Sequence, residues 1–201
     1  MKFLLKSASY VFHPLWMPFA GSLIYFLLSP RYFPTGVIKA KLLAIAILTL
    51  FIPVVFYFLL KNLGKAHNMF LYDVKERKWP LFFFILLLLM VLNQILNVYN
   101  YPALYYYFAG ILVSTFVCYI LSLFKFKISL HMVGLAGFTM FIISLSSFYH
   151  LNLIYSISFL VLSMGLTASS RLFYKAHDGW ELILGLVVGL LPQVLVIKFW
   201  L

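Results

Sequence analysis

Charged side chains are scarce in this chain of 201 residues, and acidic side chains are the scarcest of all. Asp, Glu, Lys and Arg together occupy 9% of the positions, only four positions are acidic, and 65% are hydrophobic. A soluble globular protein carries charge at roughly 25% of its positions. The composition therefore excludes a soluble domain and predicts an integral membrane protein.

Cysteine is nearly absent too, because Cys118 is the only one in the chain. A lone thiol cannot form a disulfide within the chain, and we interpret Cys118 as a small buried apolar side chain. His13, His67 and His150 are scattered along the sequence and show no metal-ligand spacing. The sequence therefore predicts no metal site.

Long charge-free intervals predict the membrane-spanning helices. A span needs about 20 apolar residues, so the intervals 79–124 and 128–170 must each hold two helices and a turn. Turn-forming residues interrupt them at 97–102 and 150–152. We expect one all-α membrane domain over residues 1–201, a polytopic helical bundle with six or seven transmembrane helices. The candidate spans are about 10–29, 40–62, 79–97, 102–124, 131–148, 151–169 and 180–200. Pro14 and Pro18 favour a kinked or partly interfacial helix for the first.

The net charge of +11 does not indicate a nucleic-acid partner, because the basic residues are scattered over short loops and form no continuous stripe. The lipid bilayer offers acidic headgroups instead. A basic cluster at headgroup depth is expected from Lys61, Lys65, Lys75, Arg77 and Lys78.

Helix parity brings three polar segments to one face of the membrane. One helical hairpin separates 61–78 from 125–131, and another separates 125–131 from 170–181. An even number of crossings returns the chain to the same side. We therefore expect one set of side chains to converge there: Lys75, Arg77, Lys78, Ser129, His131, Ser170, Arg171, His177 and Glu181.

The residues in this set have the chemistry of an anion site. His177 and Glu181 are four apart, a spacing that brings a carboxylate beside an imidazole on one helical face and orients the ring. Arg171 offers a planar fork of donors suited to phosphate. Ser129 and His131 stand at the start of a predicted helix, where unpaired backbone N–H groups attract anions.

These residues resemble the signatures of the type 2 phosphatidic acid phosphatase superfamily. Ser170-Arg171-x5-His177-x3-Glu181 resembles the third signature, which ends in Asp, and Ser129-Leu130-His131 resembles the second, Pro-Ser-Gly-His. The first signature, Lys-x6-Arg-Pro, is degraded. Anchoring it on Pro80 puts Trp79 and Tyr72 at its basic positions, and Lys75, Arg77 or Lys78 could substitute. The resemblance covers roughly residues 70–200, with the signatures within about 70–185.

The resemblance implies a metal-independent phosphatase that hydrolyses a phosphomonoester or pyrophosphate of a membrane lipid and uses no organic cofactor. His177 would become a phosphohistidine, Glu181 would orient it, and His131 would protonate the leaving group. Phosphate oxygens would be held by Arg171, Ser129, Ser170, Lys75, Arg77 and Lys78.

Two other interpretations remain open. The degraded first signature, together with Leu130 in place of glycine, also fits a non-catalytic member of the same fold that binds lipid headgroups. Arg171, His177 and Glu181 also fit a small transporter or proton relay. Transporters place ionisable groups at mid-span, whereas these residues lie at span ends, which favours chemistry at the membrane surface.

Sidedness is predicted differently by two arguments. Eleven Lys and Arg residues lie on the polar face against four on the other, which by the positive-inside rule makes the polar face cytoplasmic. The resemblance implies a bacterial cytoplasmic (inner) membrane protein whose site faces outward. Because some of the basic residues would bind phosphate, we expect an extracytoplasmic active site.

Overall fold

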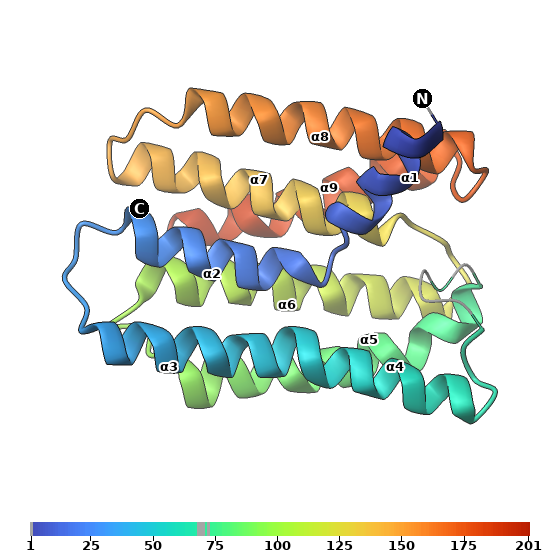
Figure 1. Cartoon of the computed structure of the whole chain (residues 1–201), viewed down its shortest axis with the longest axis horizontal. Coiled ribbons are helices and arrows are strands. Elements are labelled where there is room, and N and C mark those ends of the chain that lie inside the picture. Colours follow the sequence, from blue (N-terminus) through green and yellow to red (C-terminus); the bar gives the residue numbers. More distant parts are fainter. Residues whose placement is uncertain (1, 68–70, 72) are drawn as a thin grey trace.

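The computed structural model describes residues 2–67, 71 and 73–201, with the side chains of Lys2, Phe3, Leu4 and Lys6 left out. The described chain is helical, with no strand (Figure 1). Two of the helices continue through π-helical turns. The elements are α1 (Lys2–Val11), α2 (Trp16–Leu28), α3 (Thr35–Ala46), η1 (Ile47–Phe51), α4 (Ile52–Asn62), α5 (Val74–Met90), η2 (Val91–Ile95), α6 (Pro102–Leu123), α7 (Leu130–Phe148), α8 (Ile154–Phe173) and α9 (Gly179–Ile197).

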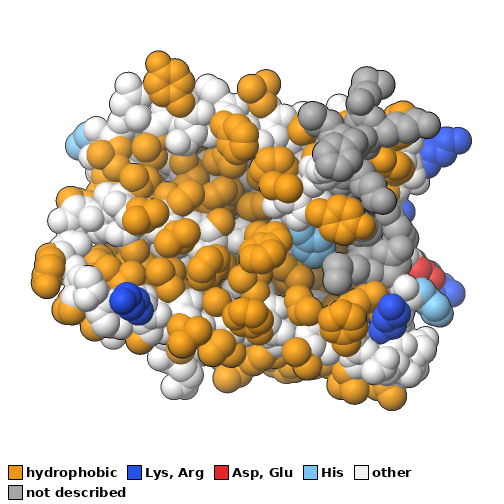
Figure 2. Space-filling view, in the orientation of Figure 1, with side chains coloured by type: hydrophobic (Ala, Val, Ile, Leu, Met, Phe, Trp, Pro, Cys, Tyr) orange, Lys and Arg blue, Asp and Glu red, His pale blue; other side chains and the backbone are white. Residues whose placement is uncertain are grey.

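Six helices within the described residues are long and apolar enough to cross a membrane: Thr35–Asn62, Val74–Ile95, Pro102–Leu123, Leu130–Phe148, Ile154–Phe173 and Gly179–Ile197. The predicted all-α polytopic bundle is confirmed, and most helix ends fall within a few residues of the predicted bounds. Hydrophobic side chains dominate the face built by α2, α3 and α4, as expected for a surface in contact with lipid (Figure 2).

The predicted first span, 10–29, is not one continuous helix. The chain leaves the helix between Val11 and Trp16, where Pro14 has no backbone N–H to continue the hydrogen-bond ladder. The 13 residues of α2 extend only about 20 Å, less than the ~30 Å of a bilayer core. The kink favoured by the prolines is therefore a complete break.

Two glycines of α9 let it lie directly against α7. A Cβ added at Gly189 would come within 2.3 Å of the Val133 carbonyl oxygen, and one at Gly185 within 2.7 Å of the Ser129 carbonyl oxygen. At the end of this contact the Ser129 N–H donates to the Glu181 carbonyl oxygen at 3.1 Å. Backbone packing therefore fixes the start of α7 beside the start of α9.

The three polar segments meet at one end of the bundle, as helix parity predicted (Figure 1, right). Arg77 of α5 donates to the Ile128 carbonyl oxygen at 2.7 Å, and Lys127 donates to the Ala176 carbonyl oxygen at 2.7 Å. The loops that follow α4, α6 and α8 are thus tied together, and α1 lies at the same end.

Candidate functional site

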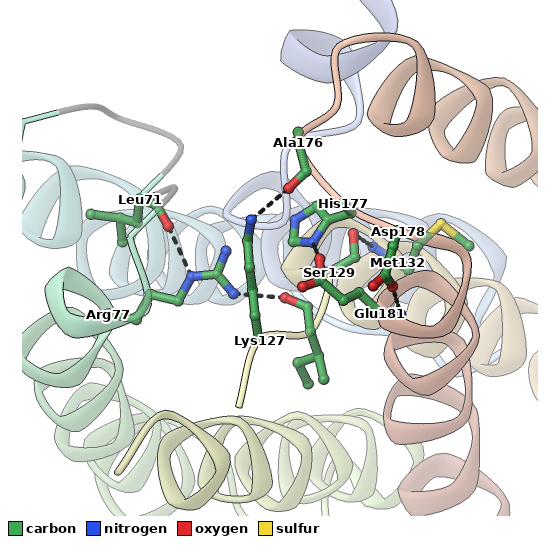
Figure 3. Close-up of polar contacts among 10 residues, drawn as sticks. Leu71, Arg77, Lys127, Ser129, Met132, Ala176, His177, Asp178 and Glu181 are labelled. Carbon is green, nitrogen blue, oxygen red and sulfur yellow. Dashed lines mark hydrogen bonds and ion pairs between the residues drawn. The ribbon is translucent and has the colours of Figure 1, made fainter. Parts of the chain in front are cut away.

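The pairing of His177 with Glu181 is the centre of the site. After α8 ends, the chain turns through Lys175, whose φ is 51°, and α9 begins at Gly179. The Asp178 carboxylate caps α9 by accepting from the Glu181 N–H at 2.8 Å. This cap directs the first turn so that Glu181 Oε2 lies 2.5 Å from His177 Nδ1 (Figure 3).

His177 is neutral at physiological pH. Burial, together with the smaller effects of the charges of Arg77, Lys127 and Arg171, lowers its pKa from 6.5 to about 3. The neighbouring Glu181 carboxylate forms a hydrogen bond with the ring at Nδ1. Because a carboxylate accepts, the single ring proton resides on Nδ1 and the lone pair on Nε2. The imidazole is thus in the form that a nucleophile needs.

Three cations surround this neutral ring. Arg77 is 3% exposed; its Nε donates to the Leu71 carbonyl oxygen at 2.8 Å, and one Nη reaches Ile128. Figure 3 shows Arg77 and Lys127 directed toward the space beside His177. Arg171, from the last turn of α8, is also 3% exposed. Two buried arginines and the half-buried Lys127 beside His177 favour binding of an anion.

Ser129 and His131 open α7 as predicted. The Ser129 hydroxyl accepts from the Met132 N–H at 3.5 Å, and Ser129 is fully buried. His131 Nε2 lies 3.0 Å from the Ser9 carbonyl oxygen; because a carbonyl only accepts, Nε2 carries a proton. His131 is therefore a hydrogen-bond donor through Nε2–H, and α1 receives that hydrogen bond in this structure.

A second histidine lies beside His131. His13, in the break between α1 and α2, meets the His131 ring edge-on with 5.2 Å between ring centroids. Burial, together with the smaller effect of the charge of Arg171, lowers the pKa of His13 to about 4. The field of Arg171 thus reaches from the His177 side of the site to His13.

Ser170 is fully buried but anchors α1. Its hydroxyl donates to the Leu5 carbonyl oxygen at 2.6 Å and lies 2.8 Å from the Ser9 hydroxyl oxygen. The residue stands next to Arg171 in sequence, yet its contacts are with the N-terminal helix. Its assignment as a phosphate ligand stays a prediction.

The structure distinguishes among the basic residues of α5. Arg77 is buried at the site, whereas Lys75 is exposed and Lys78 borders a groove shared with Trp79 and Tyr119. The helix starts at Val74 after the Asp73 cap, and this start turns only Arg77 inward. Phosphate binding by Lys75 and Lys78 stays a prediction. Tyr72, at the lysine position of the first signature, lies outside the described residues.

Sequence reasoning missed two contributors. Lys127 lies two residues before Ser129, and helix parity had already placed its loop on the polar face; that signal could have identified it. The role of Ser9 had no such signal, because its contact with His131 joins residues 122 positions apart.

We use the name cationic cluster for the three basic residues and the histidine–carboxylate pair that they surround: Arg77, Lys127, Arg171, His177 and Glu181.

Fold and site together define a polytopic α-helical membrane protein with a neutral histidine held among buried cations at one membrane face. No family model matches the chain, and neither a curated protein nor a solved structure matches it.

Proposed function

We propose that this protein is a metal-independent phosphatase that hydrolyses a phosphomonoester or pyrophosphate of a membrane lipid through a phosphohistidine at His177. The observation that carries the proposal is the 2.5 Å pairing of His177 Nδ1 with Glu181 Oε2 within the cationic cluster. An oriented neutral imidazole is a nucleophile, and the surrounding cations select a substrate with negative charge at the reacting atom.

The first half-reaction uses the free lone pair of His177. Nε2 attacks phosphorus, the N–P bond forms, and the bond from phosphorus to the leaving oxygen breaks. Glu181 accepts the Nδ1–H hydrogen bond throughout and balances the positive charge that develops on the ring. In the second half-reaction water attacks the phosphohistidine, releases inorganic phosphate and restores the imidazole.

The cations supply the electrostatic part of the mechanism. Phosphoryl transfer passes through a loose transition state whose charge is spread over three equatorial oxygens. Arg77 and Arg171 each present a planar fork that matches two such oxygens, while Lys127 acts as a point charge. Their fields act on His177 before substrate binds, so little reorganisation is needed during the reaction.

His131 is the proposed proton donor to the leaving oxygen. Its Nε2–H is bonded to the Ser9 carbonyl oxygen, so this bond must open before His131 can act on substrate. The proposal therefore includes a shift of α1 when substrate binds.

The proposed substrate is a lipid phosphate within the bilayer. We propose that the reaction takes place at the outer face of a bacterial cytoplasmic membrane.

A second candidate is a protein that binds lipid headgroups without turnover. The engagement of His131 by Ser9 favours it, because the proton donor is occupied. Both candidates use the same cations, but only the phosphatase needs a nucleophile.

Phosphate release from a lipid phosphate by the purified protein tests the proposal. His177→Ala should abolish release, and radiolabelled wild type should carry an acid-labile phosphohistidine that the variant lacks. His67→Ala is the matched control, since His67 lies at the same end but is exposed and paired only with Glu76. Headgroup binding without any release by wild type would favour the second candidate, and turnover by His177→Ala would refute the mechanism.

A further inference from the structure

A cavity of about 560 Å³ lies beneath the site, among α2, α4, α5, α6 and α7. His13, His131 and Leu130 line the end next to the site. Tyr107 and Gln193 line the opposite end, which is deeper in the bundle. The cavity therefore leads from the membrane face toward the interior of the bilayer.

The deeper wall of this cavity offers few hydrogen-bonding groups to a bound molecule. Four polar side chains on it donate to backbone carbonyl oxygens: Ser114 to Val188 at 2.9 Å, Thr115 to Ile111 at 2.8 Å, Tyr107 to Met17 at 2.7 Å and Gln193 to Tyr107 at 3.0 Å. The three hydroxyl groups have thereby used their single proton, and of the four side chains only Gln193, whose amide nitrogen carries two N–H groups, retains a donor. Water needs two to four polar partners to remain in a cavity. The wall therefore fits hydrocarbon better than water.

Two irregularities of the helices, a π-helical turn and a break, shape the cavity. Pro53 has no backbone N–H, and the π-helical turn η1 precedes it, placing Leu50 and Phe51 on the wall. The break between α1 and α2 brings Pro14 onto the opposite side, where a Cβ added at Gly134 would come within 3.0 Å of Pro14 Cβ. Both features involve prolines, so the backbone itself determines the shape of the cavity.

The dimensions match one hydrocarbon chain. A methylene group takes up about as much room as a water molecule, ~30 Å³, so the cavity holds about 20 of them. Along α6 it extends from Cys118 to Tyr107, a rise of about 16 Å at 1.5 Å per residue. Two tails of ordinary membrane length would need about twice this volume.

We propose that this cavity binds the single hydrocarbon chain of a single-chain lipid phosphate, such as an isoprenyl or monoalkyl phosphate, and selects it over two-chain glycerolipid phosphates. The inference rests on the proposed phosphatase function and adds the class of its substrate. Binding in the cavity places the phosphate at the end lined by His13 and His131, beside the cationic cluster.

Filling the deep part of the cavity tests this inference. Octyl, dodecyl and hexadecyl phosphate, an isoprenyl phosphate and phosphatidic acid are compared by phosphate release. Wild type should show kcat/KM rising with alkyl length and low for phosphatidic acid. Ile111→Trp, halfway along α6, should lower the hexadecyl-to-octyl ratio at least ~10-fold, since each excluded methylene group weakens recognition. Val113→Trp is the matched control, because Val113 is exposed on the same helix.

The outcomes separate this inference from the proposed function. An unchanged ratio in Ile111→Trp, or phosphatidic acid hydrolysed as well as hexadecyl phosphate, would overturn the cavity assignment while leaving the phosphatase in place. If no substrate releases phosphate, the proposed function fails. Native mass spectrometry with hexadecyl phosphate then tests whether the cavity binds a hydrocarbon chain. One molecule bound to wild type and lost in Ile111→Trp would support the cavity assignment, and equal binding to both proteins would refute it. Ile111→Phe replaces the tryptophan variant if that one does not fold.

Discussion

Single side chains within one turn of α5 differ sharply in what they contribute. Lys75, Arg77 and Lys78 carry the same charge, yet only Arg77 is buried beside His177. A helix distributes three neighbouring residues over different faces, so sequence alone could not choose among them. The Asp73 cap and the carbonyl oxygens of Leu71 and Ile128 make that choice.

Arg77→Lys keeps the charge but loses the planar fork, so kcat/KM for phosphate release should fall about 10²-fold. Lys61→Met is the matched control, because Lys61 is exposed at the same end of the bundle and should retain activity near wild type. Steady-state kinetics on both purified variants measure the difference. Equal losses in the two would mean that a general positive field, and not Arg77 itself, serves the reaction.

The protonation of the buried histidines predicts how stability depends on pH. Burial and nearby cations lower the pKa of His177 to about 3 and that of His13 to about 4, against 6.5 when unfolded. Between these values and pH 6.5 the unfolded chain binds more protons, so stability rises with pH across this window. Above pH 6.5 this contribution is complete and constant.

Thermal unfolding midpoints in detergent, measured between about pH 4 and pH 7, should therefore increase with pH and level off near 6.5. His177→Gln and His13→Gln remove one titrating group each, so each should flatten part of the slope. A midpoint that falls with rising pH would show that these histidines are charged in the folded protein.

At the scale of helices, hydrophobic intervals and turn residues predicted seven candidate spans, and six of them have nearly correct ends. Parity predicted which loops meet. The pairing of His177 with Glu181 was predicted from their spacing of four residues, but the two do not share a helical face: His177 lies before the Asp178 cap, and Glu181 lies in the first turn of α9. Contacts between distant segments were not predictable. The bonds from α1 to Ser170 and His131 depend on where the Pro14 break directs the N-terminal helix, and no local pattern specifies that direction.

The close contact between α7 and α9 should be sensitive to a single methyl group. Gly189→Ala places a Cβ 2.3 Å from the Val133 carbonyl oxygen, so α9 must shift, at a cost of about 1–3 kcal/mol. Glu181 starts the same helix, so phosphate release should fall as well. Gly165→Ala on α8 is the control: its Cβ meets nothing within 4 Å, and alanine favours a helix. Equal thermal stability of the two variants would refute this account of the packing.

The orientation of the cationic cluster across the membrane is a property of the whole molecule. Eleven basic residues share its side of the membrane against four on the other, which favours the cytoplasm. Three of the eleven, Arg77, Lys127 and Arg171, act on His177 and are explained by anion binding. The remaining eight against four is a small bias, so the proposed outward orientation is compatible with it.

Single cysteines at Lys65 and at Lys39 report the two sides, since both positions are exposed and lie at opposite ends of the continuous helix Thr35–Asn62 or just beyond them. Each is made in a Cys118→Ser background, which removes the only native thiol. A membrane-impermeant thiol reagent applied to intact cells should label position 65 and not position 39, because the loop after α4 lies at the site end and would face outward. Labelling after cell lysis shows that both thiols can react. The reverse pattern on intact cells would place the cationic cluster in the cytoplasm, with the phosphatase drawing its substrate from the inner leaflet.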